Sequence, residues 1–440
     1  MHKEQSHRLI KYFSFLLLFL MFAWSNRALA NDESPDNTTL AESETTPVLF
    51  PDAVIADIRF DGLKRTKEEY VKSELRQYIG RRIKDIDIHE IETELQKIGL
   101  FDSVVVSIQQ DTKESASLNI SLIEKWSLIP IPMLAYIDEW MGGLFLMDMN
   151  AFGENDKFTI GGMGSKSRVR GVMAFSTPSL IGKPGLSFSG SGAKDKVIVY
   201  DMSNDKVLEY KSINYVISGK VNYKFSIRTS VDFGLSYNFS DNDVTDAYTD
   251  FDAGQRNMDV RMISLKGKYN YEIANWNGWF LSKTQITVDA ELGLNQSDMV
   301  TPSVMLTLRY QQPIFWDQFR FISHAAGYYS YHSIVPLYKK GRAVGSDILP
   351  NRFVSPIMVA AGAGFEVGVY RFSLASFSIG GQYQVFYGQD WDSSFAFHHG
   401  WSCAIHANMS RVAVPAFSLG LAQDVVTREL KYNIGLGMSL

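Results

Sequence analysis

Four side chains near the C-terminus are of the types that ligate zinc: His398, His399, Cys403 and His406. A shared zinc site needs every donor atom about 2 Å from one ion. In an extended strand, His399 and Cys403 share a face but lie about 13 Å apart at ~3.3 Å per residue, and His406 points to the opposite face. The spacing therefore argues against a metal site.

Two short motifs resemble catalytic or phosphate-binding loops without completing them. Gly400-Trp401-Ser402-Cys403-Ala404 is one residue short of the nucleophile elbow Gly-x-Ser-x-Gly, and it lies in strand-like sequence rather than at a strand–turn–helix junction. Gly162-Met163-Gly164-Ser165-Lys166-Ser167 lacks the spacing and the following helix of a P-loop, so we predict a glycine-rich hairpin. We expect no catalytic residue, no metal and no cofactor, and we expect that the chain is not an enzyme. A hydrolase with a serine and a histidine on a barrel wall is the alternative.

The N-terminus predicts export. Basic residues precede a short apolar stretch at 12–24 and the small residues Ala28-Leu29-Ala30, which is the pattern of a secretory signal peptide over residues 1–30. Residues 31–51 are acidic and rich in Ser and Thr, and we predict a disordered linker. An exported chain of this kind folds outside the cytoplasm.

Charge, cysteine content and hydropathy narrow the class further. The formal net charge is -5 and no long basic run occurs, which argues against a nucleic-acid partner. Cys403 is the only cysteine, so no intrachain disulfide can form. Beyond the signal there is no apolar run of roughly 18 residues, and no transmembrane helix is predicted. If the chain enters a membrane, it must therefore do so as a closed β-barrel.

Residues 52–126 have the pattern of a small β-α-α-β-β domain. A strand at 54–61 ends at Gly62, and two more strands are expected near 101–106 and 116–123. Thr66 and Glu69 fit a capping box at the start of the first helix. Gly80 and Gly99 follow the two helices, where a left-handed C-cap is favoured. Apolar residues recur at helical spacing in both helices: Val71, Leu75 and Ile79, then Ile88, Ile91, Leu95 and Ile98.

After Trp126 the apolar period changes from 3.6 to 2. Segments of about ten residues alternate apolar and polar side chains, which is typical of a transmembrane β-barrel. Residues 127–440 number 440 − 126 = 314, or about 20 per strand and connection over sixteen strands. We predict an antiparallel transmembrane barrel of about sixteen strands, although fourteen would also fit. A soluble β-sandwich or propeller is the alternative. The acidic loop at 240–256 is expected to face outside.

These patterns together resemble the BamA/TamA superfamily of outer-membrane assembly and secretion proteins. The small domain looks like a POTRA domain. Gly142-Gly143 with the segment 148–153 looks like the family's first barrel hairpin, and 175–182 looks like its third strand and turn. Residues 334–338 and 341–353 occupy the place of the large sixth loop, and Phe365-Glu366 begins the strand after it.

The resemblance has two departures. The family's sixth loop carries Val-Arg-Gly-Phe/Tyr, whose arginine pairs with an acidic group on the inner wall; here the loop ends Asn351-Arg352-Phe353, and Gln384 to Gly388 lacks the family's wall aspartate. The loop lock is thus either rebuilt from Arg352, Phe353 and Glu366, or lost, with Arg352 a solvated loop residue. The chain also ends on Leu440 where the family usually has an aromatic residue.

The resemblance implies a protein that handles other polypeptides at the outer membrane of a Gram-negative-type bacterium, with its POTRA domain in the periplasm. Its partners would be unfolded outer-membrane or secreted clients, outer-membrane lipid and possible subunits of an assembly machinery. A pore or structural barrel with a docking POTRA domain is the alternative. The POTRA residues expected to bind client are Ile58, Phe60, Gly62, Gly99, Phe101 and Val104. The expected barrel seam comprises Gly142, Gly143, Tyr432, Gly435, Gly437 and Leu440.

Overall fold

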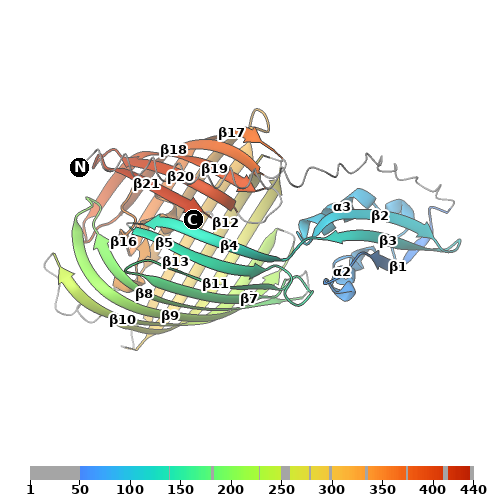
Figure 1. The fold of residues 1–440 in the computed structure, drawn as a ribbon, viewed down its shortest axis with the longest axis horizontal. Helices are drawn as coiled ribbons and strands as arrows, with labels where there is room; N and C mark the ends of the chain where they lie inside the picture. The colour runs from blue at the N-terminus through green and yellow to red at the C-terminus, as the bar shows by residue number, and fades with distance from the viewer. Residues whose placement is uncertain are drawn as a thin grey trace, which may run out of the picture.

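The structure is a computed structural model that describes residues 50–436 with short gaps. The gaps are residues 138, 180–182, 227, 249–257, 277–278, 297–299, 332–334, 373–374 and 410–414. The predicted signal peptide, the linker up to residue 49, the turn at 180–182, and Gly437 to Leu440 lie outside the described residues. A small α+β domain stands at one end of a large barrel (Figure 1).

The small domain is a three-stranded sheet with helices on one face. Its sheet has the order β1-β3-β2, with β1 parallel and β2 antiparallel to the central β3. The elements are β1 (Val54–Asp61), α2 (Glu68–Glu74), the 3-10 helices η1 (Arg76–Tyr78) and η2 (Ile83–Asp85), α3 (Ile88–Lys97), β2 (Phe101–Gln110) and β3 (Ser115–Glu124).

Of the helix residues that the 3.6 period selected, four are fully buried, Ile88 and Ile98 are partly buried, and one is exposed. Val71, Leu75, Ile91 and Leu95 are fully buried against the sheet, whereas Ile79 is 40% exposed because α2 ends at Glu74, before that turn. Gly80 and Gly99 have positive φ, as expected after a helix. The predicted capping box is wrong: Lys67 is the N-cap of α2 and no side chain caps it. The Thr66 hydroxyl instead accepts a hydrogen bond from Asn150.

The barrel has sixteen antiparallel strands, each paired with its neighbours in sequence, and the last strand returns to the first. This confirms the predicted fold and strand number. The strands are β4 (Leu128–Ile137), β5 (Glu139–Asp148), β6 (Lys157–Gly164), β7 (Val169–Ser176), β8 (Gly185–Tyr200), β9 (Lys206–Lys224), β10 (Thr229–Ala247), β11 (Val260–Trp276), β12 (Leu281–Asn295), β13 (Val300–Pro313), β14 (Phe319–Ser330), β17 (Ile357–Arg371), β18 (Ala375–Gln389), β19 (Phe395–Met409), β20 (Pro415–Asp424) and β21 (Leu430–Leu436).

The alternation read from the sequence divides the barrel into an apolar outside and a polar inside. On β10, for example, Phe233 and Leu235 are 62% and 60% exposed on the outer face, while Ser236 between Leu235 and Tyr237 is buried. Outward apolar side chains with inward polar ones are the arrangement of a barrel whose outer surface contacts lipid. No helix in the described part of the chain is long and apolar enough to span a membrane.

Two sequence expectations about the barrel strands are corrected. The first strand is β4, so Gly142 and Gly143 lie on the second strand, and 175–176 end the fourth rather than the third. The expected loop at 240–256 begins later, because β10 continues to Ala247 in register with β9, through a bulge between Val244 and Asp246.

Candidate functional site

The turn between β5 and β6, residues 149–156, docks onto the small domain. The Arg65 guanidinium donates to the Asp148 carboxylate at 2.5 Å and to the Ser127 hydroxyl at 2.7 Å. The Lys67 backbone N–H donates to the Gly153 carbonyl at 2.8 Å, and its ammonium pairs with Glu154 at 2.8 Å. These contacts join residues 65–67 of the small domain to the barrel, so the two domains meet in a defined orientation.

Two carboxylates in this joint are held in their ionised form. The Lys67 ammonium lowers the pKa of Glu154 through a hydrogen bond and charge attraction. Burial would raise the pKa of Glu124, but hydrogen bonds from Thr66 and Arg65 outweigh that effect and lower it. The joint is therefore built on charged acceptors that acid would neutralise.

Most of the predicted client-binding side chains lie in the core of the small domain. Ile58, Phe101 and Val104 are buried, and Phe60 packs against that core. Gly62 has φ +86°, and a Cβ there would lie 2.0 Å from the Leu122 carbonyl oxygen, so it is required for the turn.

Gly99 likewise shapes the chain, with φ +82° after α3. A client could therefore meet only the backbone edges or the outward side chains. Of the outward ones, Val105 and Ile123 are large, apolar and exposed.

The seam of the barrel lies between its last and first strands. Among the described residues, which end β21 at Leu436, three pairs join β21 to β4: Ile434 with Tyr136, Gly435 with Ala135 and Leu436 with Leu134. Gly435 thus lies at the seam as predicted. Tyr432 is on the same last strand and pairs with Leu421 of β20 on one side; the residue in register with it on the β4 side, 138, lies outside the described residues.

Gly142 and Gly143 do not lie at this seam, contrary to the prediction. They pair with β4 on one side and with β6 on the other, one strand away from β21. The stretch of β4 that has no β21 partner among the described residues carries Pro130 and Pro132. Proline has no N–H to donate to a ladder, so within sheets it occurs mainly on edge strands, at strand starts and at bulges. The sequence prediction missed β4, the strand that carries those prolines.

The sixth loop, residues 331–356, folds into the distal half of the barrel, away from the small domain (Figure 1). It contains the 3-10 helices η4 (Val335–Leu337) and η5 (Gly341–Val344) and a two-stranded sheet of β15 (Lys339–Lys340) and β16 (Val354–Ser355). Its described side chains pack on two opposite parts of the inner wall.

On one side the loop is anchored by apolar burial. Ile348, Leu349 and Phe353 are at most 1% exposed and pack with Tyr328, Met358, Phe386 and other wall residues of β14, β17, β18 and β20. The rings of Phe353 and Phe386 meet edge to face at 5.8 Å. Burial of each such side chain stabilises the docked loop by roughly 1.5–3 kcal/mol. On the other side Val335 packs with Val199, Val207, Leu208 and Tyr210 of β8 and β9.

The predicted pairing of Arg352 with Glu366 is wrong. Glu366 is 3% exposed and is occupied by the Arg320 guanidinium at 2.6 Å and the Ser378 hydroxyl at 2.5 Å. Arg320 also lies over the Phe280 ring, 4.5 Å from its centroid. Arg352 instead reaches the opposite wall, where it donates to the Lys196 carbonyl at 3.4 Å.

Gln384 provides the polar anchor of the sixth loop. Its amide oxygen accepts from the Asp347 backbone N–H at 2.9 Å, and its amide nitrogen donates to the Asp347 carboxylate and to Ser402, both at 3.1 Å. Lys431 adds a bond from its ammonium to the Ile348 carbonyl at 2.5 Å. The lock is therefore rebuilt: the predicted Phe353 is part of its apolar anchor, whereas Gln384 and Lys431, which make its polar anchor, were not chosen by the sequence prediction. The sequence did contain a clue to this polar anchor, because Gln384 is the first residue of the segment 384–388, which lacks the aspartate of the family's inner wall.

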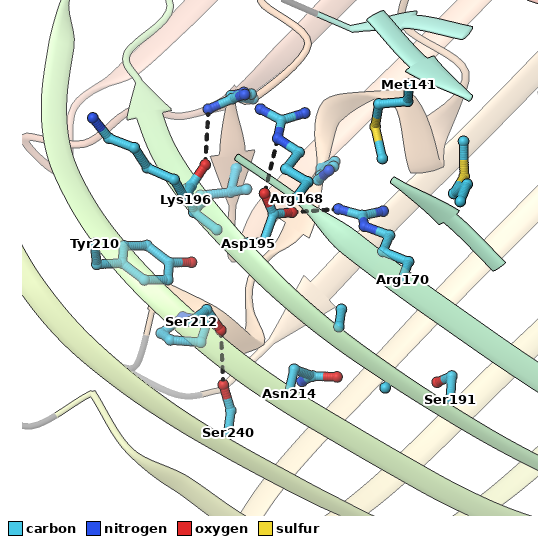
Figure 2. A pocket seen from close by; sticks show the side chains of 18 of the residues that line it. Met141, Arg168, Arg170, Ser191, Asp195, Lys196, Tyr210, Ser212, Asn214 and Ser240 are labelled. Atoms are coloured by element: carbon cyan, nitrogen blue, oxygen red, sulfur yellow. Dashed lines mark hydrogen bonds and ion pairs between the residues drawn. The ribbon is translucent and has the colours of Figure 1, made fainter. Parts of the chain in front are cut away.

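A cavity of about 550 Å³ lies between the sixth loop and the wall formed by β5 to β9. Figure 2 shows Arg168 and Arg170 around Asp195, with Tyr210, Ser212, Asn214 and Ser240 along the next strands. Lys340 and Arg352 of the sixth loop complete the cationic part of the lining.

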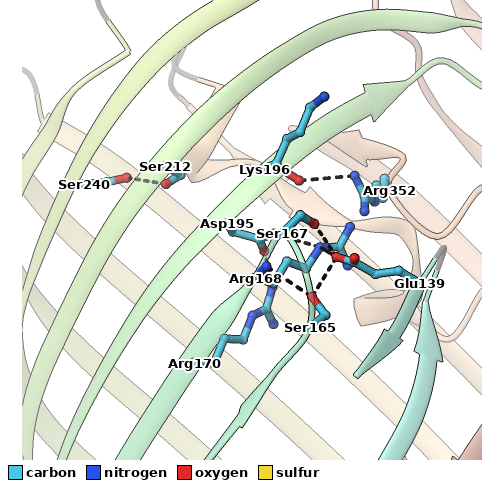
Figure 3. A network of polar contacts seen from close by, with 10 residues as sticks. All are labelled: Glu139, Ser165, Ser167, Arg168, Arg170, Asp195, Lys196, Ser212, Ser240 and Arg352. Carbon is cyan, nitrogen blue, oxygen red and sulfur yellow. Dashed lines mark hydrogen bonds and ion pairs between the residues drawn. The ribbon is translucent and has the colours of Figure 1, made fainter. Parts of the chain in front are cut away.

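A network of ion pairs fixes the wall side of this cavity (Figure 3). Arg168, 5% exposed, contacts Asp195 at 2.8 Å and Glu139 at 3.4 Å, while Arg170 reaches the second oxygen of Asp195 at 2.5 Å. Ser165 and Ser167 of the β6–β7 turn also donate to Glu139. That turn is the predicted glycine-rich hairpin, closed by a Ser165 N–H to Arg168 carbonyl bond.

The histidines considered as metal ligands point in different directions. His398 is buried and contacts Asp424 at 2.6 Å, whereas His399 faces outward and contacts the Tyr383 hydroxyl. Ser402 bonds to Gln384. Among the described residues, no three His, Cys, Asp or Glu side chains converge as a metal ion would require.

Comparisons with known proteins agree with this architecture. Residues 53–125 match the family described as POTRA, surface antigen variable number repeat. No curated protein matches the sequence. Among solved structures, BamA from Haemophilus ducreyi lacking POTRA domains 1–3 superposes with a TM-score of 0.61 at 12% identity, over 88% of this chain and 84% of that one.

Two structures of CdiB are also similar. CdiB from Acinetobacter baumannii gives a TM-score of 0.60 at 12% identity, over 88% of this chain and 74% of that one. CdiB from Escherichia coli gives 0.63 at 11% identity, over 88% and 77%. Identities this low establish a shared fold. The chain is a POTRA domain followed by a barrel of the fold seen in BamA and CdiB.

Proposed function

We propose that this chain is an outer-membrane barrel protein that binds unfolded client polypeptide and assists its insertion into, or translocation across, the outer membrane. The observation that carries the proposal is a POTRA domain joined directly to the first barrel strand: Glu124 ends β3, Leu128 begins β4, and Arg65 binds Asp148 and Ser127 of the barrel side. The POTRA domain would lie in the periplasm.

The client would be received by the POTRA sheet. Among the described residues β2 pairs with β3 alone as a strand, so its outer edge presents backbone N–H and C=O groups, of which the Val106 N–H donates to the Glu92 carboxylate of α3 at 3.1 Å. Such an edge recruits extended peptide by strand addition, with little demand on client sequence. The exposed Val105 and Ile123 add an apolar surface beside that edge. No catalytic residue, cofactor or nucleic acid takes part in this mechanism.

A passive pore or structural barrel is the second candidate. The sixth loop argues against a passive pore, because its buried side chains fill space between opposite walls of the distal lumen. The outward apolar side chains of the barrel would contact outer-membrane lipid. Other subunits of an assembly machinery could dock on the POTRA domain.

The test is depletion of the protein in its host, followed by comparison of the outer-membrane proteome with wild type. Loss of one or a few barrel or surface proteins, with periplasmic accumulation, would support the proposal and identify the client. Complementation with Val105→Asp is expected to fail partly, because a charge disturbs the apolar surface beside the edge.

Ser107→Asp is the matched control, since it places the same charge on the same strand without removing an apolar group. An unchanged proteome after depletion would overturn the assembly role, and conductance in a planar bilayer would then test the pore.

A further inference from the structure

The cavity beneath the sixth loop carries an excess of positive charge. Four cationic side chains line it, Arg168, Arg170, Lys340 and Arg352, and Asp195 is the one carboxylate in the lining that the structure describes. Lys196 contributes its backbone, and its side chain points to the other face, where it pairs with Glu209 at 2.7 Å. Behind the lining, Glu139 pairs with Arg168. Among the described residues, four positive charges thus face two negative ones.

Lys340 is the least compensated of these cations. Among the described residues, no carboxylate lies within ion-pair distance of its ammonium, which is exposed to the cavity. Burial of the group by the surrounding barrel lowers the pKa of the Lys340 amine, and repulsion from Arg170 lowers it further. A ligand anion placed between Lys340 and Arg170 would remove this repulsion.

The cavity is long rather than compact. Its lining follows β8 from Ser191 to Val199, eight residues apart, which corresponds to about 26 Å at ~3.3 Å per residue. A single small anion fills only one end of such a space, whereas an extended peptide segment follows its length.

The cavity wall also offers groups that suit a peptide main chain. Ser191, Ser212, Asn214 and Ser240 line the cavity on β8, β9 and β10. Ser212 is the cross-strand partner of Asp195, and the Ser212 and Ser240 hydroxyls lie 3.3 Å apart across neighbouring strands (Figure 2). Hydroxyls and amides can donate to carbonyls or accept from N–H groups. Apolar residues of β5 and β7, such as Met141 and Val172, also line the cavity.

We propose that this lumenal cavity binds an acidic, extended segment of a client polypeptide, with its carboxylates at Lys340, Arg170 and Arg352. The proposal deepens the proposed function, since it names the chemistry of the client that the barrel holds. Carboxylates on guanidinium and ammonium groups form charge-assisted hydrogen bonds, which are stronger where water is excluded.

The test uses the purified full-length protein in detergent micelles and two fluorescent ten-residue peptides, one of alternating Glu and Ser and one with Gln in place of Glu. Fluorescence anisotropy is expected to show binding of the Glu peptide that weakens with salt, and little binding of the Gln peptide. Lys340→Gln is expected to raise the Kd roughly tenfold, the usual effect of losing one charge-assisted contact.

Lys268→Gln is the matched control, because Lys268 is a barrel lysine on β11 that pairs with Asp289 and lies outside the cavity lining. Heat-modifiable mobility on gels checks that each variant is folded. Equal binding of both peptides, or equal weakening by both lysine variants, would overturn the proposal. Inorganic phosphate that binds as tightly as the Glu peptide would also overturn it, by making the cavity a small-anion site.

The two proposals can fail separately. Binding of the Glu peptide with no change in the outer-membrane proteome on depletion would refute the assembly role and leave the cavity site intact. Loss of clients on depletion, with no binding of the Glu peptide, would support the assembly role and refute the cavity site.

Discussion

Gln384 and Asp347 exchange two hydrogen bonds, one to the Asp347 backbone and one to its carboxylate, and thereby fix the sixth loop to the inner wall of β18. Gln384 is 1% exposed, so water does not compete for these bonds. The amide also donates to Ser402 on the adjacent strand. A neutral amide can anchor both a donor and an acceptor of the loop, which an aspartate at the same place could not do.

We predict that Gln384→Leu loosens the sixth loop. The substitution removes the partner of the Asp347 N–H and of its carboxylate, and a buried polar group left unpaired costs about 1–3 kcal/mol. The expected result is faster cleavage within 331–356 by added protease and larger, noisier conductance in a planar bilayer. Gln285→Leu is the control, because Gln285 is a part-buried amide on β12 that bonds to Asn270 away from the loop. Equal effects of the two variants would show a general loss of barrel stability.

A second prediction concerns Arg320, which neutralises the buried Glu366 near the end of the barrel that faces the POTRA domain. Arg320→Ala leaves this carboxylate charged and without its cation, and breaking such a pair typically costs about 3–5 kcal/mol. Denaturant unfolding of the barrel in micelles is expected to shift to lower urea by a corresponding amount. The double variant Arg320→Met with Glu366→Leu removes both charges and should recover most of the loss. If the double variant unfolds as early as the single one, packing rather than charge is responsible.

The regular elements were predictable from sequence because each follows one period. Val71 and Leu75 at helical spacing and Phe233 and Leu235 at strand spacing lie on the predicted faces. The positive φ of Gly80 could also be predicted from local sequence, because a glycine directly after a helix favours that conformation. The helical and strand periods, together with the glycines at turns, were therefore enough to predict the POTRA domain and the barrel.

The site was less predictable because its residues meet only through the closed barrel. Glu366 was chosen as the partner of Arg352 from the family pattern, yet the strand register places Arg320 directly opposite Glu366. No local pattern reveals which wall residue a long loop will meet. The first strand of the barrel, β4, was not predicted either; it carries Pro130 and Pro132, and proline is rare inside strands that are paired on both sides.

A third prediction follows from the carboxylates of the POTRA joint. The pKa values of Glu124 and Glu154 are lowered in the folded protein, from an ordinary value of 4.5. The stability that these two ionised carboxylates give to the joint is therefore complete above pH 4.5, and it is lost as the pH falls through their lowered pKa values. Spin labels at Gln109→Cys and Arg228→Cys, in a Cys403→Ser background, should give a narrow distance distribution at pH 7 that broadens below about pH 4.

Glu154→Gln tests whether the joint itself titrates. It removes the charge that pairs with Lys67, so the distribution should already be broader at pH 7 and should change less on acidification. Glu114→Gln, at an exposed position in the β2–β3 turn, is the control and should behave as wild type. A distribution that stays narrow in acid would mean that the Arg65–Ser127 bond and the backbone contacts hold the joint without these charges.

The last prediction concerns the seam. Pro130 and Pro132 lie where β4 has no β21 partner among the described residues, and the β4–β5 ladder is complete on the other side. Their missing N–H groups therefore face the seam, where no added strand can receive a hydrogen bond from them. Replacing both by Val supplies two donors, each worth about 0.5–1.5 kcal/mol when paired. Hydrogen exchange over 430–436 should slow several-fold, and client assembly in a complemented strain should fall because the seam opens less often.

Pro302→Val on β13, far from the seam, is the control. Slower exchange with undiminished assembly would separate seam opening from function and leave the POTRA edge as the element to test.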